Sequence, residues 1–342
     1  MLALIFQCFL GVCLMVNATD VHELTMKGWE LSEEAVAAYE EVLKEKPDDI
    51  DTRTILLGYY FKVKHRDRAL AVNHENHVLW LVENFPEAEV LAVPEGGLNP
   101  FLNAKAYKKA KVLWSKHLKG DSKNLVLIKN ASQFFMVSDT DKSEELLKRG
   151  AELAPKDSAW PLDLGHLFSR KMIGKRGEPR RQAANAALKQ FEVAYKLSDK
   201  LGRDSILTSI GKVAFAAGQM DQAKKYGAKM LEPGDEKSWN YGNKFYHGHH
   251  LLGRIALAAG NVQEAKNRLL EAAQTPGSPQ LGSFGPNMTL ANELLKAGEK
   301  EVVVEYFELC GEFWDMGAER LATWKEEVEN GKQPDFGSNL NY

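Results

Sequence analysis

The sequence is poor in cysteine. Its 342 residues contain three cysteines, and two of them, Cys8 and Cys13, fall in an apolar N-terminal stretch. A chain that has lost this stretch keeps only Cys310, which excludes an internal disulfide. The aromatic residues close to Cys310 predict that its thiol is buried and behaves as a small apolar group rather than as a nucleophile.

The sequence also lacks a strong excess of charge of either sign. Its 44 Lys and Arg residues face 47 Asp and Glu residues, which gives a formal net charge of −3 at pH 7. Domains dedicated to nucleic-acid binding are usually basic, so we expect no nucleic-acid partner. The basic stretch at residues 171–180 is interpreted as a solvated loop, with contact to an anionic partner as the alternative.

Sequence motifs for catalysis are missing. The chain has no P-loop, no dinucleotide-binding glycine pattern and no nucleophile elbow. The Asp-Phe-Gly triplet at residues 335–337 resembles a kinase motif, but the other kinase motifs are absent. We therefore predict a protein that is not an enzyme and that needs neither a cofactor nor a metal.

One histidine pair leaves an alternative open. His247 and His250 are three residues apart, which places both imidazoles on one face of a helix at a spacing that suits a metal. No carboxylate or cysteine follows one turn later to complete a ligand set. A polar groove surface is the favoured interpretation, and a repeat-fold hydrolase or metal-dependent protein with a site near this pair is the alternative.

The first 18 residues carry no charge. The apolar run from Leu2 to Val16 is interrupted only by Gln7. As a helix it would span about 22 Å, which is short of the roughly 30 Å hydrocarbon core of a bilayer. We predict a signal peptide at residues 1–18, a secreted or periplasmic protein, and no stable membrane insertion after cleavage. An uncleaved N-terminal membrane anchor is the alternative, because no Lys or Arg precedes the run.

The most informative pattern is a short sequence motif that occurs twice, which we call the repeat phrase. In each copy an apolar residue and a glycine are followed seven residues later by a turn glycine, and an alanine comes five residues after that turn. The positions are Gly211, Gly218 and Ala223 in the first copy, and Gly253, Gly260 and Ala265 in the second. Small residues let two helices approach closely, and the middle glycine suits the turn between them, so the phrase predicts a repeated helix–turn–helix unit.

This phrase resembles the tetratricopeptide repeat, whose period is about 34 residues. Weaker copies place the small residue at positions 58, 131, 165 and 291. Residues 277–288 and 334–342 are similar to the end of uncharacterised bacterial repeat proteins. The resemblance implies an all-α fold, a right-handed α-solenoid of antiparallel TPR-like helix pairs. The expected parts are a solenoid over residues 19–315, clearest at 205–272, and then a capping helix and irregular tail at 316–342.

The resemblance also implies where a partner would bind, because the first helix of each TPR pair lines the concave groove. The implied groove residues are Tyr59, Lys62, His166, Arg170, Lys212, Phe215, His247, His250, Arg254, Asn292 and Lys296. None of these residues is acidic, and Lys212 and Arg254 on adjacent repeats would clamp an anionic group. We therefore expect an exported scaffold that binds a protein or peptide without catalysis, the partner carrying an acidic segment or a terminal carboxylate.

Overall fold

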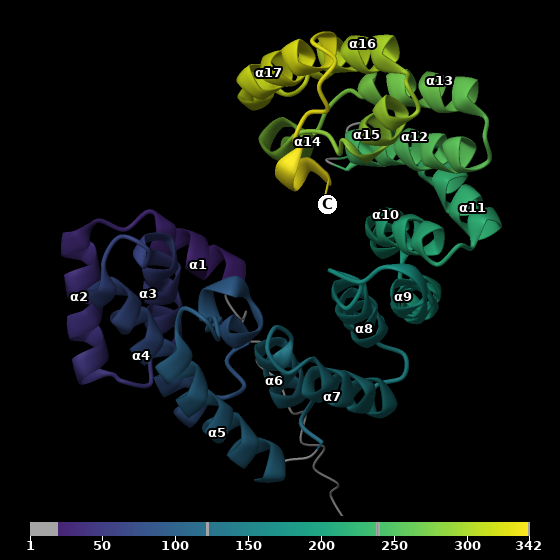
Figure 1. Cartoon of the computed structure of the whole chain (residues 1–342). Coiled ribbons are helices and arrows are strands. Elements are labelled where there is room, and N and C mark those ends of the chain that lie inside the picture. The colour runs from purple at the N-terminus through teal and green to yellow at the C-terminus, as the bar shows by residue number, and fades with distance from the viewer. Residues whose placement is uncertain (1–19, 121–122, 237, 239, 341–342) are drawn as a thin grey trace, which may run out of the picture. The chain divides into compact units, whose positions relative to one another are not determined.

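The computed structural model describes residues 20–120, 123–236, 238 and 240–340 (Figure 1). The predicted signal peptide at residues 1–18 lies outside the described residues. The described part of the chain contains α-helices and short 3-10 helices and no β-strand, so the all-α prediction is confirmed. No helix within it has both the length and the apolar character needed to cross a membrane.

The chain divides into two compact units, Met1–Leu153 and Ala154–Tyr342, which we call unit 1 and unit 2. In unit 1 the helix α3 packs against α1, α2 and α4, and α6 packs against α7. The helices of unit 1 are α1 (Val21–Trp29), α2 (Glu33–Glu45), α3 (Ile50–Val63), α4 (Arg68–Asn84), η1 (Glu89–Ala92), η2 (Pro94–Gly96), α5 (Ala104–Gly120), α6 (Leu125–Phe135) and α7 (Thr140–Leu153).

Local sequence sets where the helices of unit 1 begin. The side chains of Ser32, Asp49 and Asp67 each accept a hydrogen bond from a backbone N–H in the first turn of α2, α3 and α4 respectively. Gly58 is the small residue of the first of the two weak copies in this unit, and its close neighbour lies on α1. A Cβ added at Gly58 would strike the backbone of Thr25 on α1, so this glycine permits the close contact of α3 with the preceding helix.

Unit 2 is a stack of helix pairs; from α8 to α13 each helix packs against the next in the sequence, and α16 packs against both α15 and α17. Two further contacts, α10 with α12 and α12 with α15, join the first helices of successive pairs, as expected for a helical repeat (Figure 1). The helices of unit 2 are α8 (Ala159–Arg170), α9 (Gly177–Leu197), α10 (Lys200–Ala216), α11 (Met220–Met230), α12 (Tyr241–Ala258), α13 (Val262–Ala273), α14 (Pro279–Phe284), α15 (Thr289–Lys296), α16 (Lys300–Cys310), η3 (Asp315–Gly317), α17 (Ala318–Glu329) and η4 (Gly337–Leu340).

The repeated phrase explains the close packing of unit 2. A Cβ at Gly253 would lie 2.5 Å from Leu290 Cδ2 on α15 and 3.0 Å from Arg268 Cβ on α13. The residue at position 253 therefore has to be small, because a larger side chain would collide both with α13 of the same helix pair and with α15 of the next pair. The turn glycines Gly218 and Gly260 have φ of +79° and +81°, a backbone conformation that residues with a Cβ rarely adopt.

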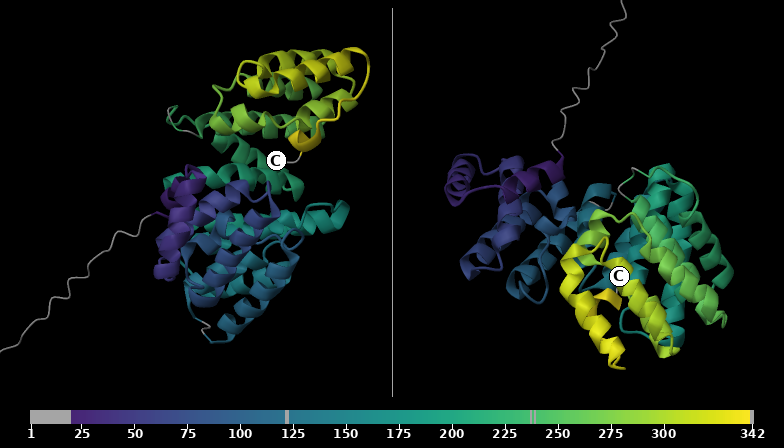
Figure 2. Two further views of the ribbon diagram at one scale, coloured as in Figure 1. Left: turned by 90° about the vertical axis from the view of Figure 1, so that its left-hand side faces the viewer. Right: turned by 90° about the horizontal axis from the view of Figure 1, so that it is seen from above.

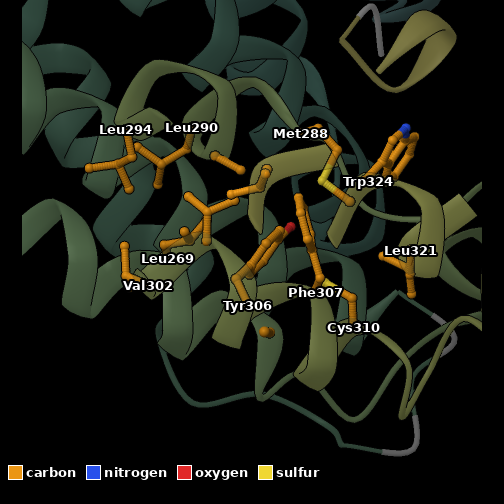
Figure 3. Close-up of a cluster of buried hydrophobic side chains, with 14 of the residues drawn as sticks. Leu269, Met288, Leu290, Leu294, Val302, Tyr306, Phe307, Cys310, Leu321 and Trp324 are labelled. Carbon is orange, nitrogen blue, oxygen red and sulfur yellow. The ribbon is translucent and has the colours of Figure 1, made fainter. Parts of the chain in front are cut away.

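The last helices enclose a large apolar cluster (Figure 3), and α16 and α17 lie side by side in it (Figure 2). Cys310 is fully buried there, beside Tyr306 and Phe307, which confirms the expectation of a buried thiol. Burial raises the pKa of this thiol, so the thiolate that would act as a nucleophile is disfavoured. Phe336 of the Asp-Phe-Gly triplet is 2% exposed and belongs to the same cluster.

The segment after α17 folds back onto the loop that follows α14 within unit 2. The side-chain amide of Asn339 donates hydrogen bonds to the carbonyl oxygens of Phe284 and Pro286, at 3.1 and 3.0 Å. The Asn339 carbonyl oxygen accepts a hydrogen bond from the N–H of Met288, at 2.8 Å. These contacts hold the loop that follows α14. The C-terminal segment around Asn339 therefore fixes the position of this loop, although both have little regular helix.

Candidate nucleic-acid interface

Two adjoining cavities lie on the first helices of the pairs in unit 2. The larger has a volume of about 710 Å³ and is lined by Ser205, Thr208, Lys212, Asn240, Asn243, His247, Gln280, Leu281, Ser283, Phe284, Gly285, Arg320 and Ser338. The smaller, of about 280 Å³, is lined by Met172, Arg180, Thr208, Lys212, Phe215, Ala216, Met230, His247, His250, Leu251, Arg254, Asn287, Thr289 and Leu340. They share Thr208, Lys212 and His247, and we call the two together the unit-2 groove.

Helical periodicity brings these side chains to one surface. Thr208 and Lys212 are four residues apart on α10, as Asn243 and His247 are on α12, so each pair lies on one helix face. The ends of the two helices are tied by an ion pair between Lys244 Nζ and Asp204 Oδ2, at 2.9 Å. Lys244 is 8% exposed, and its ion pair fixes the spacing of the helices that form the floor of the groove.

Lys212 is at the junction of the two cavities. Its side chain is accessible to solvent within the groove, yet protein atoms surround it on most sides. This crowding, and after it the positive charge of Arg254, lowers the pKa of Lys212 to about 8. The amine is therefore still largely protonated at neutral pH, and within the described residues it makes no ion pair.

Two arginines add positive charge to the groove. Arg320 of α17 lines the larger cavity and Arg180 of α9 lines the smaller one, and both side chains are exposed. Neither makes an ion pair with another described residue. No Asp or Glu is among the described residues that line either cavity. The groove therefore holds Lys212 and these two cations without a neutralising carboxylate.

Arg254 differs from these three cations because its charge is already balanced. Its Nη2 lies 2.6 Å from Oε1 of Glu293 and its Nε lies 2.9 Å from Oε2, so the pair is bidentate. The guanidinium also lies over the ring of Phe215, 4.5 Å from the ring centroid. An anionic ligand would have to compete with Glu293 for this side chain.

The two histidines lie in the groove, and the described residues give them no further metal ligand. His250 Nε2 accepts a hydrogen bond from the N–H of Leu290, at 3.3 Å. Burial, and then the positive charges of Arg254 and Lys212, lower the pKa of His250, and burial and Lys212 do the same for His247. Among the residues that the structure describes, no group of three or more His, Cys, Asp or Glu side chains could hold a metal ion. The metal-dependent alternative therefore gains no ligand set.

The structure brings five of the sequence-predicted groove residues together in the smaller cavity: Lys212, Phe215, His247, His250 and Arg254. His166 and Arg170 are exposed on α8, Lys296 is exposed at the end of α15, and none of them lines either cavity. Asn292 likewise lines neither cavity, and its Oδ1 accepts a hydrogen bond from Gln333 Nε2, at 2.7 Å.

The two predicted groove residues of unit 1 are engaged within that unit. Tyr59 is 8% exposed and packs in the apolar cluster of α2 and α3. Lys62 Nζ donates a hydrogen bond to the carbonyl oxygen of Trp29, at 2.7 Å. Phe135, another residue that the TPR register assigns to the groove, is 2% exposed and belongs to the core. The TPR register of these weak copies therefore assigns two core residues, Tyr59 and Phe135, to the surface.

Sequence reasoning missed the walls of the larger cavity. Gln280 and Phe284 belong to a stretch that reads as a loop, and Arg320 and Ser338 follow the last repeat. The basic stretch at 171–180 was interpreted as a solvated loop, although it ends with Arg180 at the smaller cavity. Its excess of positive charge was the available signal, and it carried no information about which surface it would face.

No protein-family model matches the sequence, and no curated protein matches it. Among solved structures the chain is similar to a monomeric mutant of IFIT1 with m7Gppp-AAAA, at 17% identity and a TM-score of 0.50, over 91% of this chain and 72% of that chain. The human IFIT1 dimer with PPP-AAAA gives 16% identity and a TM-score of 0.49, over 91% and 73%. IFIT1 is a TPR-containing helical-repeat protein. The chain has a TPR-like fold.

The structure of the IFIT1 monomeric mutant corrects one expectation. It holds RNA, as m7Gppp-AAAA, on a similar fold, so the exclusion of a nucleic-acid partner was wrong. The reasoning failed because net charge is an average over the whole chain. A chain with a net charge of −3 still presents a groove whose described lining contains basic residues and no acidic one.

Proposed function

We propose that the chain is a helical-repeat binding protein, without catalysis, whose unit-2 groove binds the phosphate-bearing end of a single-stranded nucleic acid. The observation that carries this proposal is the set of three cations, Arg180, Lys212 and Arg320, in a groove that no carboxylate lines. A polyanion that extends through both cavities can contact all three cations and accept charge-assisted hydrogen bonds from them.

The size of the cavities supports a compact ligand. Pockets for small ligands have volumes of about 300 to 1,000 Å³. The larger cavity, at about 710 Å³, is within this range, and the smaller one extends it by about 280 Å³. Hydroxyl and amide side chains around the cations offer hydrogen bonds to phosphate and sugar. The structure of similar fold that holds m7Gppp-AAAA supports an RNA end as the ligand class.

The test is the binding of fluorescent PPP-AAAA to the purified chain. We expect Lys212→Glu to weaken binding at least about tenfold, because it removes one cation and adds an anion near the phosphates. The matched control is Lys224→Glu on α11, an exposed lysine that lines neither cavity. The slope of log affinity against log salt should also become shallower by about 0.7 to 1 in the groove variant only.

Two results would count against the proposal. Equal affinity of the Lys212→Glu and Lys224→Glu variants would place the nucleic acid elsewhere or show that it binds nonspecifically. The second result is competition by a short acidic peptide. If the peptide displaces fluorescent PPP-AAAA at the same concentration as unlabelled PPP-AAAA or at a lower one, the result would favour the peptide partner that the TPR register implies.

Location is a separate proposal that rests on the sequence. We propose that residues 1–18 direct export and are removed, because they form an uncharged segment too short to cross a bilayer as a helix. N-terminal sequencing of the chain recovered from its native compartment tests this. A new N-terminus near residue 19 supports export with cleavage, and an intact N-terminus in the membrane fraction supports the anchor.

A further inference from the structure

We propose that α14 provides a ring-binding subsite in the larger cavity, so that the ligand of the unit-2 groove is a nucleotide whose base lies on Phe284 while its phosphates reach Lys212. This inference rests on the proposed function and makes it more specific. It assigns a role to side chains that the charge argument does not use.

Phe284 is an exposed aromatic side chain on a fixed backbone. It lines the larger cavity and is 68% exposed, although it is fully apolar. The following residue, Gly285, has φ of +81°, and a Cβ there would strike the indole ring of Trp314. The carbonyl oxygens on either side of Gly285 accept the two hydrogen bonds from Asn339. The ring is therefore presented by a rigid support, as a stacking platform requires.

Polar donors accompany this ring. Gln280 is four residues before Phe284, so the two side chains lie on one face of α14. Its Oε1 accepts a hydrogen bond from Asn243 Nδ2 at 2.8 Å, and Asn240 Oδ1 accepts another from the same amide at 3.2 Å. Asn243 is itself held by Ser278, whose Oγ donates to Asn243 Oδ1 at 2.7 Å. This network uses the oxygens of Gln280 and Asn240 and leaves their amide N–H groups without a partner among the described residues.

The amide N–H groups complement the acceptor atoms on the edge of a base. Nucleobases carry ring nitrogens and carbonyl oxygens that accept hydrogen bonds, and every base has a face that can stack on an aromatic ring. Inorganic polyphosphate offers neither feature, and an acidic peptide offers no obligatory ring. The combination of Phe284 with Gln280 and Asn240 therefore favours a nucleotide over the other anions that the cations alone would accept.

The distribution of charge orients the ligand. Phe284 and Gln280 line only the larger cavity, whereas Arg180 lines only the smaller one, and Lys212 is at their junction. A nucleotide with its base on Phe284 places its phosphates over Lys212 and directs the phosphate chain toward Arg180. Arg320 lines only the larger cavity, so in this orientation it is available to the sugar and the first phosphate.

The experiment compares ligands with and without a ring. The dissociation constants of ATP, PPP-AAAA and inorganic tripolyphosphate are measured calorimetrically on the wild-type protein and on Phe284→Ala. We expect Phe284→Ala to weaken ATP and PPP-AAAA by about tenfold, the size of one lost base–aromatic stack, and to change tripolyphosphate less than about twofold. ATP against PPP-AAAA distinguishes a free nucleotide from an RNA end as the ligand.

Two further variants guard against loss of fold. Phe284→Tyr keeps the ring and should bind ATP within about twofold of the wild type. Phe101→Ala removes another exposed phenylalanine, 82% exposed in unit 1, and should change no dissociation constant. Equal weakening of all three ligands by Phe284→Ala, or no weakening of any, would overturn the ring subsite.

The outcomes separate this inference from the proposed function. If the wild type binds ATP and tripolyphosphate equally well and Lys212→Glu loses both, the anion site stands and the ring subsite is wrong. If the wild type binds none of the three ligands, the proposed function is wrong and the subsite falls with it.

Discussion

Replacement of Gly253 by leucine tests the close packing on which unit 2 depends. A Cβ at this position meets Leu290 Cδ2 at 2.5 Å, Arg268 Cβ at 3.0 Å and the Ala265 carbonyl oxygen at 3.4 Å. The Leu290 methyl is the end of a flexible side chain and can rotate away. The other two atoms are a Cβ and a backbone oxygen, so they move only if α13 moves.

The magnitude follows from two opposing contributions. Overpacking of a close-packed site costs about 1 to 3 kcal/mol, and the upper end applies here because a leucine adds three carbons beyond the Cβ. The replacement of a mid-helix glycine returns about 0.8 kcal/mol of helix propensity. Gly253→Leu should therefore lower the free energy of unfolding by roughly 2 kcal/mol, which is about 4 to 8 °C in Tm for a unit of this size.

Gly253→Ala and Ala258→Leu complete the series. The alanine variant gains propensity, but its Cβ requires a rotation of the Leu290 side chain and a small shift of α13 away from Arg268 Cβ, so we expect its stability within about 1 kcal/mol of the wild type. Ala258 is exposed on the same helix, and its leucine variant should stay within about 0.5 kcal/mol. Urea unfolding measures the free energy of unfolding of each variant. Hydrogen exchange of peptides from residues 241–273 shows whether the loss of stability lies inside unit 2. A Gly253→Leu variant as stable as Ala258→Leu would refute the assigned helix packing.

Three other outcomes are expected. Binding of PPP-AAAA should weaken as pH rises through about 8, the pKa of Lys212, because this side chain then loses its proton. The Lys212→Arg variant should bind without this pH dependence, because arginine stays charged. Wild-type affinity that does not change over this pH range would contradict the prediction. A thiol reagent should label Cys310 only after unfolding, by peptide mass mapping, because the side chain is fully buried; rapid native labelling would show an accessible thiol. Phe336→Ala should cost about 3 to 5 kcal/mol in urea unfolding, and a loss below 1 kcal/mol would mean that this segment does not contribute to the core.

The sequence was most informative where the repeat phrase was intact. The two copies around Gly211 and Gly253 gave the helix pairs, and their register placed Lys212 and His247 on neighbouring helices that share a cavity. Helical periodicity is a local property, so an intact phrase is enough to decide which face a side chain occupies. In the weak copy at Gly58 the small residue serves a contact with α1, and Tyr59, which the register assigns to the groove, lies in the core of unit 1.

Other features depended on contacts between distant parts of the chain. Arg254 and Glu293 are far apart in the sequence, and their bidentate ion pair follows from how α12 and α15 pack. The wall formed by α14 depends on Asn339, which reaches it from beyond the last helix. A pattern read along the chain could identify an arginine as basic and could not show whether a carboxylate already neutralises it.

The return of the segment around Asn339 to the loop after α14 has a consequence for the order of events during synthesis. The helices α10 and α12 leave the ribosome early, but the groove gains Ser338 and Leu340 only when the chain has been made to residue 340. Domains tend to fold from the N-terminal side as they emerge. A partly made unit 2 can therefore contain α10 and α12, which form the floor of the groove, before the segment around Asn339 completes its wall. A ligand that stabilises the complete groove by mass action would then favour finished chains over truncated ones.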